Sequence, residues 1–193
     1  YLDEVHAVGI YGPQGNGVAA HQNLIDRVDI IQSNFAKAYG VIGGYIAGTK
    51  GLVDYVRSYA SGFIFTTSLP PAIVAAAQES IEILKNDSSY RQKLWENVHH
   101  LKSNLRKTNV NFIDSPSHIV PVVVGDAFAC QQLAFDLLND FGLYVQPINY
   151  PTVPRGQERL RLTVTPAHTG EMIDQLTEAL NFLWNKKKVK QAA

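Results

Sequence analysis

The chain has 193 residues, of which 46% are hydrophobic and 18% charged, a composition typical of one large or two small folded domains. Basic and acidic residues both number 17, so charge gives no reason to expect nucleic acid or an anionic membrane as a partner. The single cysteine, Cys130, excludes an intrachain disulfide and a thiolate metal site, and no apolar run approaches the roughly 20 residues of a membrane span. The opening Tyr1-Leu2-Asp3 reads as the end of a strand, so we expect part of the protein to lie upstream.

Short apolar stretches alternate with glycine-rich turns in the first third of the chain. Two of these stretches, 28–33 and 44–48, are predicted to be buried strands, whereas 9–17 has the composition of a loop. Thr49 is a suitable N-cap for a helix over about 50–59.

A helical region follows Pro70 and Pro71, because proline favours the first turn of a helix. Good helix formers predict one helix over 72–85 and a second from 89 to about 105, with one bent helix as the alternative.

The last third of the chain alternates strands and helices. Strands are predicted at 118–124, 143–145 and 159–164. Asp126 and Gly142 are expected to cap a helix over 127–141, and a final helix is expected over 169–184. The chain is therefore predicted to be an α/β protein with four parts: the latter part of a large domain with a mainly parallel sheet (1–70), a connecting helical region (71–110), a small α+β domain (111–185) and a frayed tail (186–193).

Two groups in the first third have the chemistry that pyridoxal phosphate needs. Asp3 follows an apolar strand, and Lys37 lies in a loop of small residues. A lysine amine can form a Schiff base with the cofactor aldehyde, and a carboxylate can keep the pyridine nitrogen protonated. His6 stands at the same strand end, and Tyr39 predicts apolar surroundings that would lower the pKa of the Lys37 amine. The alternative is an ordinary α/β turn with a solvated lysine and a loop histidine.

Hydroxyl and guanidinium groups suggest two further contacts. The residues at 66–68, Thr-Thr-Ser, precede the proline-started helix and could bind a phosphate there, or serve as a plain N-cap. One of Arg155, Arg159 and Arg161 could clamp a substrate carboxylate, unless all three are surface residues on an edge strand. No group of histidines, cysteines and carboxylates has the spacing of metal ligands.

The chain closely resembles a known family along nearly its whole length. The most specific stretches lie at 3–9, 56–60, 62–71, 117–122 and 145–156. They resemble the C-terminal half of the α-oxoamine synthases, which are fold-type I pyridoxal phosphate enzymes. They look most like the member that condenses glycine with succinyl-CoA to give 5-aminolevulinate, CoA and CO2, the first step of haem and tetrapyrrole synthesis. The alternatives are another α-oxoamine synthase with a different acyl-CoA, or a non-catalytic dimerisation fragment.

The resemblance implies a role for individual residues. It implies Lys37 as the Schiff-base lysine, Asp3 as the partner of the pyridine nitrogen, His6 at the phenolic oxygen, Thr66 beside Thr67 at the cofactor phosphate, Arg161 at the glycine carboxylate and Thr152 near the succinyl carboxylate. Ser33-Asn34 stand where the family has Gly-Thr, so Asn34 is expected to offer an amide donor to the phosphate instead.

The resemblance also implies a homodimer with sites shared between subunits. The charge balance, the apolar pattern and the residue spacing predict no nucleic acid, no membrane span and no metal. The compartment would be the cytoplasm in a bacterium or the mitochondrial matrix in a eukaryote. The aromatic residue that stacks on the cofactor ring, and much of the acyl-CoA site, would lie upstream of this sequence.

Overall fold

A computed structural model describes residues 1–187 of the chain. The chain divides into two compact units, Tyr1–Arg91 and Gln92–Ala193. Their boundary lies inside one helix, α5 (Ser89–Leu105), between the predicted divisions near residues 70 and 110. The predicted tail begins within the last helix, and its residues 188–193 lie outside the described part.

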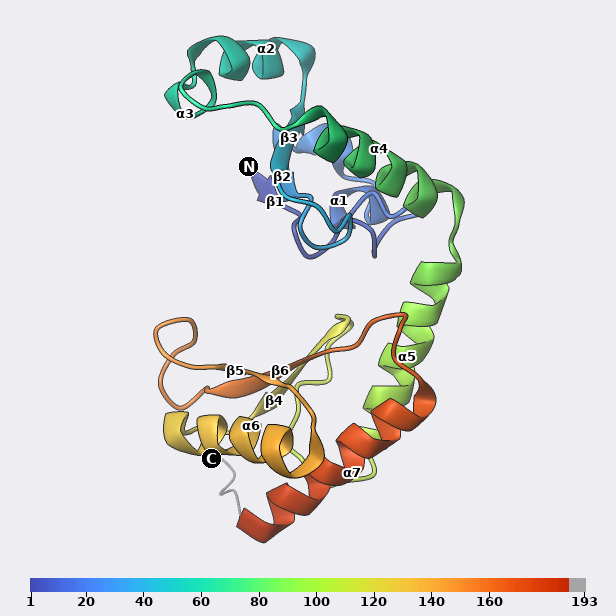
Figure 1. Ribbon diagram of the computed structural model, residues 1–193, viewed down its shortest axis with the longest axis vertical. Coiled ribbons are helices and arrows are strands. Elements are labelled where there is room, and N and C mark those ends of the chain that lie inside the picture. The colour runs from blue at the N-terminus through green and yellow to red at the C-terminus, as the bar shows by residue number, and fades with distance from the viewer. Residues whose placement is uncertain (188–193) are drawn as a thin grey trace. The chain divides into compact units, whose positions relative to one another are not determined.

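The first unit contains a three-stranded sheet in the order β1-β2-β3 (Figure 1). Its strands are β1 (Leu2–Asp3), β2 (Ile30–Asn34) and β3 (Gly44–Gly48). β1 runs parallel to β2, and β3 runs antiparallel to it. Between β1 and β2 the chain forms the short helix α1 (Val18–His21) and the 3-10 turn η1 (Ile25–Arg27), which the sequence did not predict.

Helix α2 (Lys50–Tyr59) confirms the prediction at both ends, and the Thr49 hydroxyl accepts a hydrogen bond from the Leu52 N–H as its cap. The short α3 (Ser61–Ile64) follows it, and α4 (Pro71–Asn86) begins at a proline, as expected. The N-cap of α4 is Pro70 and makes no side-chain cap bond, so the hydroxyls at 66–68 do not cap this helix.

Helices α4 and α5 are separate, so the alternative of one bent helix is wrong. Asp87 ends α4 in an extended conformation, with φ −114° and ψ 107°. Its carboxylate then accepts a 2.8 Å hydrogen bond from the Ser89 N–H, at the first turn of α5. The acidic side chain thus stabilises the start of the new helix instead of a continuation of the old one.

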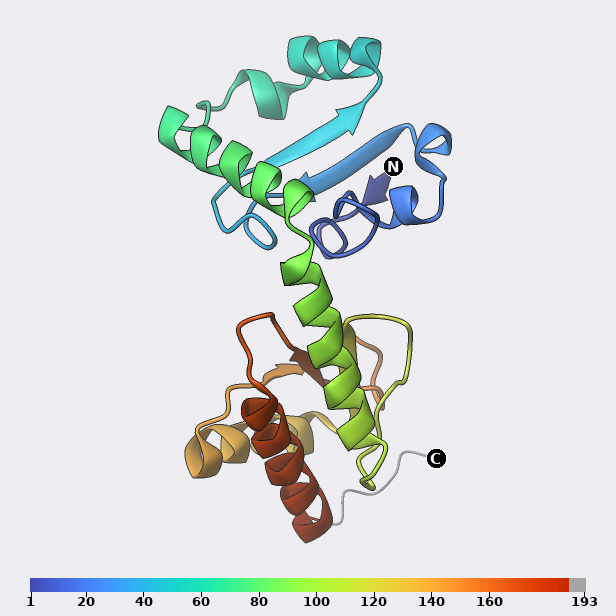
Figure 2. The same cartoon turned by 90° about the vertical axis from the view of Figure 1, so that its right-hand side faces the viewer.

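The second unit contains an antiparallel sheet in the order β4-β6-β5. Its strands are β4 (Ile119–Val123), β5 (Gln146–Ile148) and β6 (Arg159–Thr163). The predicted strand at 143–145 is wrong by three residues, because pairing with β6 begins only at Gln146. Helices α6 (Ala127–Phe141) and α7 (Gly170–Lys187) lie on one side of this sheet (Figures 1 and 2). The caps of α6 are the predicted ones: Asp126 accepts from the Ala129 N–H, and Gly142 is left-handed with φ 69°.

The core of the second unit is made by apolar side chains from α5, α6, α7 and the sheet. Those with almost no exposed surface are Val98, Leu101, Leu105, Val120, Val122, Leu133, Leu137, Leu160, Ile173, Leu180 and Leu183. Burying each such side chain contributes about 1.5–3 kcal/mol, so this core is the main stabilising feature of the unit. None of the helices within residues 1–187 combines the length and apolar character needed to cross a bilayer.

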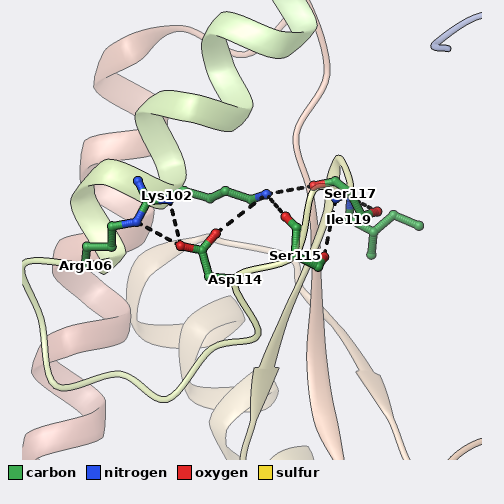
Figure 3. A network of polar contacts seen from close by, with 6 residues as sticks. All are labelled: Lys102, Arg106, Asp114, Ser115, Ser117 and Ile119. Atoms are coloured by element: carbon green, nitrogen blue, oxygen red, sulfur yellow. Dashed lines mark hydrogen bonds and ion pairs between the residues drawn. The ribbon is translucent and has the colours of Figure 1, made fainter. Parts of the chain in front are cut away.

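A buried lysine ties α5 to the segment that leads into β4 (Figure 3). Lys102 Nζ donates to the backbone oxygens of Ser115 and Ser117, and Asp114 lies 4.0 Å from the same nitrogen. Arg106 binds the Asp114 carboxylate at 2.7 Å. Because Lys102 is almost completely buried, desolvation lowers the pKa of its amine, and the two carbonyl groups compensate for the lost water.

Candidate functional site

The carboxyl ends of β1 and β2 bring the first candidate residues together. Asp3 pairs with Gln32 in the parallel register, and the Glu4 N–H donates to the Gln32 oxygen at 2.8 Å. Asn34 ends β2 two residues later, at the same edge of the sheet. Side chains that follow parallel strands meet at this edge, which is where α/β proteins place ligand contacts.

Asp3 is exposed and makes a turn contact with one of its two carboxylate oxygens. Its Oδ1 accepts the Val5 N–H at 2.8 Å. Because Asp3 is exposed, its carboxylate is accessible to a proton-bearing group of a ligand. The turn interpretation and the functional interpretation of Asp3 are therefore compatible. His6 is exposed three residues further along the same segment.

The loop that carries Lys37 connects β2 to β3 and is closed by backbone and aromatic contacts. The Phe35 N–H donates to the Gly43 oxygen at 2.9 Å, and the Phe35 ring contacts those of Tyr39 and Tyr45 at centroid distances of 5.9 and 5.2 Å. Lys37 itself is exposed. The apolar surroundings predicted for the lysine enclose Tyr39 instead, where burial and then the Tyr45 hydroxyl raise the pKa of the phenol well above its ordinary value.

Two glycines let other segments approach the lysine loop closely. A Cβ on Gly9 would lie 2.6 Å from the Ala38 Cβ, so the segment after His6 packs directly beside the residue that follows Lys37. A Cβ on Gly43 would lie 2.7 Å from Leu69, which brings the segment after α3 to the other end of the loop. Both glycines have positive φ, 80° and 118°, a conformation that side chains disfavour.

The phosphate contacts predicted from the sequence are only partly organised in this chain. The Asn34 Oδ1 accepts the Ala36 N–H at 3.1 Å, so the amide nitrogen is left as a donor without a partner among residues 1–187. Thr66 and Thr67 are exposed on the segment between α3 and α4. The first unit therefore has three hydrogen-bond donors that suit a phosphate. Two of them, the hydroxyls of Thr66 and Thr67, lie on an exposed segment.

Glu4 is an important residue that the sequence interpretation missed. Its carboxylate is buried and accepts 2.8 Å hydrogen bonds from the Val18 and Ala19 N–H groups. Gly17 is required beside it, because a Cβ there would lie 2.6 Å from Oε2. Glu4 thus fastens the end of the glycine-rich loop to the strand that carries Asp3. A glutamate directly after the candidate aspartate was the only available signal.

In the second unit, Arg161 lies on the central strand β6, paired with Pro121 of β4 and Gln146 of β5. The edge-strand part of the alternative is therefore wrong for this residue, although Arg161 is exposed, as a surface arginine would be. Arg161 lines a cavity of about 760 Å³, a volume suited to a small-molecule ligand. Arg159 bonds to Gln157, and Arg155 lies over the Tyr150 ring at 4.9 Å, so neither joins Arg161 in the cavity lining.

Thr152 lies outside that cavity lining, in the exposed turn after β5, and its N–H donates to the Asn149 oxygen at 2.9 Å. Cys130 is buried in α6, which agrees with a packing role. Among the described residues, no three side chains of the metal-ligating types come together.

Comparison with known proteins shows relatives over nearly the whole chain. It is 54% identical to 5-aminolevulinate synthase 1 of Cereibacter sphaeroides, over 95% of this chain and 45% of the relative. It is 52% identical to 5-aminolevulinate synthase of Rhizobium meliloti, over 96% of this chain and 46% of the relative. The mitochondrial 5-aminolevulinate synthase of Emericella nidulans is 46% identical over 100% of this chain and 33% of the relative. The chain therefore spans about half the length of the bacterial relatives it matches.

Solved structures agree on the fold. A high-resolution structure of SPT with a PLP internal aldimine has a TM-score of 0.90 at 31% identity, over 97% of this chain and 47% of the solved one. A serine palmitoyltransferase of Sphingomonas wittichii has the same TM-score at 29% identity, with the same coverage. These neighbours confirm the predicted fold-type I class. Residues 1–180 match the family described as aminotransferase class I and II, and the chain belongs to that family.

Proposed function

We propose that this chain is part of a 5-aminolevulinate synthase, which condenses glycine with succinyl-CoA and releases 5-aminolevulinate, CoA and CO2 with the aid of pyridoxal phosphate. The observation that carries the proposal is the common sheet edge at which Asp3, Asn34 and the Lys37 loop meet, in a chain 54% identical to such an enzyme. The resulting activity would begin haem and tetrapyrrole synthesis.

The donor set at this edge suits the cofactor. An exposed amine, an exposed carboxylate and an amide donor are the groups that an aldehyde, a protonated pyridine nitrogen and a phosphate require. Bound there, pyridoxal phosphate would supply an electron sink for negative charge at the amino acid α-carbon.

The residues of the first unit would hold the cofactor and move protons. Lys37 would bind the cofactor aldehyde through its amine, and after release of that amine it would take the proton from the glycine α-carbon. Asp3 would hold the ring nitrogen in its protonated form through Oδ2, and His6 would hydrogen-bond the phenolic oxygen. The phosphate would receive the Asn34 amide and the hydroxyls of the Thr66–Thr67 segment.

The residues of the second unit would bind the substrates. Arg161 would hold the glycine carboxylate through its guanidinium group, because a planar two-pronged donor matches a carboxylate. Thr152 would contribute a hydroxyl near the succinyl carboxylate. Restricting both substrates in this way lowers the entropy cost of the bond-forming step.

A second copy of the protein is the proposed partner. Helices α2 and α3 leave a group of large apolar side chains exposed: Tyr55, Tyr59, Phe63, Ile64 and Phe65. Phe65 is 87% exposed and directly precedes Thr66. Contiguous exposed aromatic residues mark interaction surfaces, and cover by a second subunit would bring Thr66 to a shared site.

Because the relatives include bacterial and mitochondrial proteins, we propose the cytoplasm or the mitochondrial matrix as the compartment, according to the source.

The test uses the full-length protein that contains this chain. After borohydride reduction in the presence of pyridoxal phosphate, mass spectrometry of the digested protein is expected to find the cofactor on the peptide of Lys37. Lys37→Ala should abolish that adduct. Lys50→Ala, at an exposed lysine paired with Asp54, should leave it unchanged. An adduct in Lys37→Ala would exclude the assigned lysine.

The acyl substrate is tested separately, by CoA release with glycine and succinyl-, acetyl- or long-chain acyl-CoA. Fastest turnover with succinyl-CoA supports the proposal, whereas preference for another thioester identifies a different α-oxoamine synthase. No release with any thioester would favour a non-catalytic dimerisation role.

A further inference from the structure

Several polar side chains besides Arg161 line the cavity of the second unit, and one of them is His168. His168 lines the same cavity, which lies between the strand β6, the turn after α6 and the first turns of α7. Met172 and Leu176 of α7 supply apolar wall. A lining that combines apolar wall with polar groups is the usual composition of a small-molecule site.

His168 belongs to a tight turn that follows β6 and is closed by its own side chain. The Thr165 N–H donates to His168 Nδ1 at 2.9 Å, and the His168 N–H donates to the Thr165 oxygen at 3.2 Å. The Ala167 N–H donates to the Thr165 hydroxyl at 3.3 Å. The ring orientation is therefore set by hydrogen bonds within the turn.

A buried asparagine of α5 stabilises this turn through hydrogen bonds to its backbone. Asn97 is 2% exposed, and its Nδ2 donates to the backbone oxygens of both Thr165 and His168 at 2.8 Å. Both hydrogens of the amide are used on the one turn, and a buried amide is costly to leave unpaired. Asn97 thus keeps the His168 backbone at one place beside β6.

These contacts decide which ring nitrogen carries the proton. A backbone N–H can only donate, so His168 Nδ1 must be an acceptor, and the neutral ring carries its hydrogen on Nε2. His168, which lines the cavity together with the cationic Arg161, therefore has its hydrogen-bond donor at Nε2.

We propose that His168 is a second carboxylate-binding residue of the Arg161 cavity and that Asn97 is the residue that positions it. The inference rests on the proposed function, because it takes glycine as the carboxylate ligand. His168 Nε2–H would donate to the glycine carboxylate together with Arg161, and would contribute to recognition of the carboxylate without taking part in bond breaking.

The test measures ligand binding to the full-length, cofactor-loaded protein, with the visible absorbance of the cofactor as the signal. Glycine is compared with methylamine, which has the same amine and no carboxylate. His168→Asn keeps an acceptor near Nδ1 for the Thr165 N–H but lacks the distal donor. We expect it to weaken glycine binding roughly 10- to 100-fold, the effect of losing one hydrogen bond to a charged group, with methylamine binding unchanged.

Two further variants separate binding from positioning. His168→Gln, which offers an amide near the position of Nε2, is expected to recover part of the glycine affinity. Asn97→Asp replaces the shared donor by a charge facing two carbonyl oxygens, and we expect it to reduce the glycine-to-methylamine affinity ratio as well. A purely structural role would lower the unfolding midpoint and leave that ratio unaltered. His99→Asn, at an exposed histidine of α5, is the matched control and should change nothing.

The possible results distinguish a failure of the inference from a failure of the proposed function. If the native protein prefers glycine to methylamine and His168→Asn retains the same preference, the inference is overturned and the proposed function stands. If the native protein shows no such preference, both are overturned. Should the variants fail to fold, nitrogen NMR of histidine-labelled native protein still decides: a protonated Nε2 whose resonance shifts with glycine supports the inference, and a protonated Nδ1 or an unchanged resonance contradicts it.

Discussion

Glu4 determines the local order of the segment that presents Asp3. Its carboxylate is 1% exposed and is balanced by two backbone N–H groups at the start of α1. A buried carboxylate is tolerated when such charge-assisted hydrogen bonds replace its water. The neutral amide of glutamine can satisfy only one of these donors and turns its own N–H₂ group toward the other.

We therefore expect Glu4→Gln to lower the free energy of unfolding of the protein by roughly 1–3 kcal/mol. Urea unfolding followed by far-ultraviolet circular dichroism measures the change. Glu79→Gln, at an exposed position of α4, makes the same chemical replacement without a buried contact and should have almost no effect. Equal stabilities of the two variants would contradict the role given to Glu4.

Cys130 offers a pH-dependent prediction. Burial raises the pKa of its thiol from 9.0 to about 11. In the folded protein, the fraction of Cys130 in the thiolate form is then on the order of one in a thousand at about pH 8. A thiol reagent should therefore modify the protein only as fast as it unfolds. An immediate stoichiometric reaction of the native protein would exclude this environment.

The same shift affects stability. The unfolded chain releases the thiol proton at a lower pH than the folded one does. The contribution of Cys130 to stability is therefore complete below pH 9.0 and is lost as the pH rises toward about 11. Comparing unfolding midpoints of native protein and Cys130→Ala across this window measures the loss.

At the scale of elements, helix ends were predictable and strand positions less so. Thr49, Asp126 and Gly142 act on backbone groups within one turn of their own position, so α2 and α6 begin and end as the sequence indicates. The strand expected at 143–145 is instead formed by Gln146–Ile148, which includes a proline. Pairing with a strand far along the chain decides that position, and an edge strand tolerates proline.

The positions of the candidate residues could be predicted from the local sequence, as the helix ends could. Their surroundings could not. The apolar pattern marks the strand that ends at Asp3 and the strand that precedes the Lys37 loop. The approach of Gly9 to Ala38, the Glu4 contacts and the turn held by Asn97 depend on residues far apart in the chain, and no local pattern indicates them.

The connection between α5 and β4 depends on Lys102. Lys102→Met keeps the length of the side chain but leaves two backbone oxygens, of Ser115 and Ser117, without their donor. We expect a loss of about 2 kcal/mol in the free energy of unfolding. Lys93→Met, at an exposed lysine of the same helix, should be nearly neutral. Chemical unfolding of both variants measures the difference, and equal losses would show that the network contributes little.

At the scale of the whole molecule, the two units differ in how much core they possess. In Tyr1–Arg91 the buried apolar residues are Val5, Val8, Ala19 and Ala77, two of them alanines, whereas the second unit has an extended leucine-rich core. The first unit leaves much of its apolar surface open, including α2, which buries no residue. This difference predicts unequal stability of the units in isolation.

A fragment of residues 89–193 is therefore expected to unfold cooperatively in urea, and a fragment of residues 1–88 is expected to show no cooperative transition. Circular dichroism and hydrophobic-dye binding compare the two. A cooperative transition in the first fragment would mean that its exposed apolar surface does not limit its stability.

If Arg161 binds the substrate carboxylate as proposed, the central position of β6 restricts how this protein could be altered to accept a different amino acid. Pairing with β4 on one side and β5 on the other fixes the Arg161 backbone, so β6 itself cannot shift to make room for a bulkier substrate. Room must come from shortening the side chains that share its cavity, such as Gln146 or Thr163. Laboratory evolution toward larger amino acids should therefore accumulate replacements at these two positions and leave the strand unchanged.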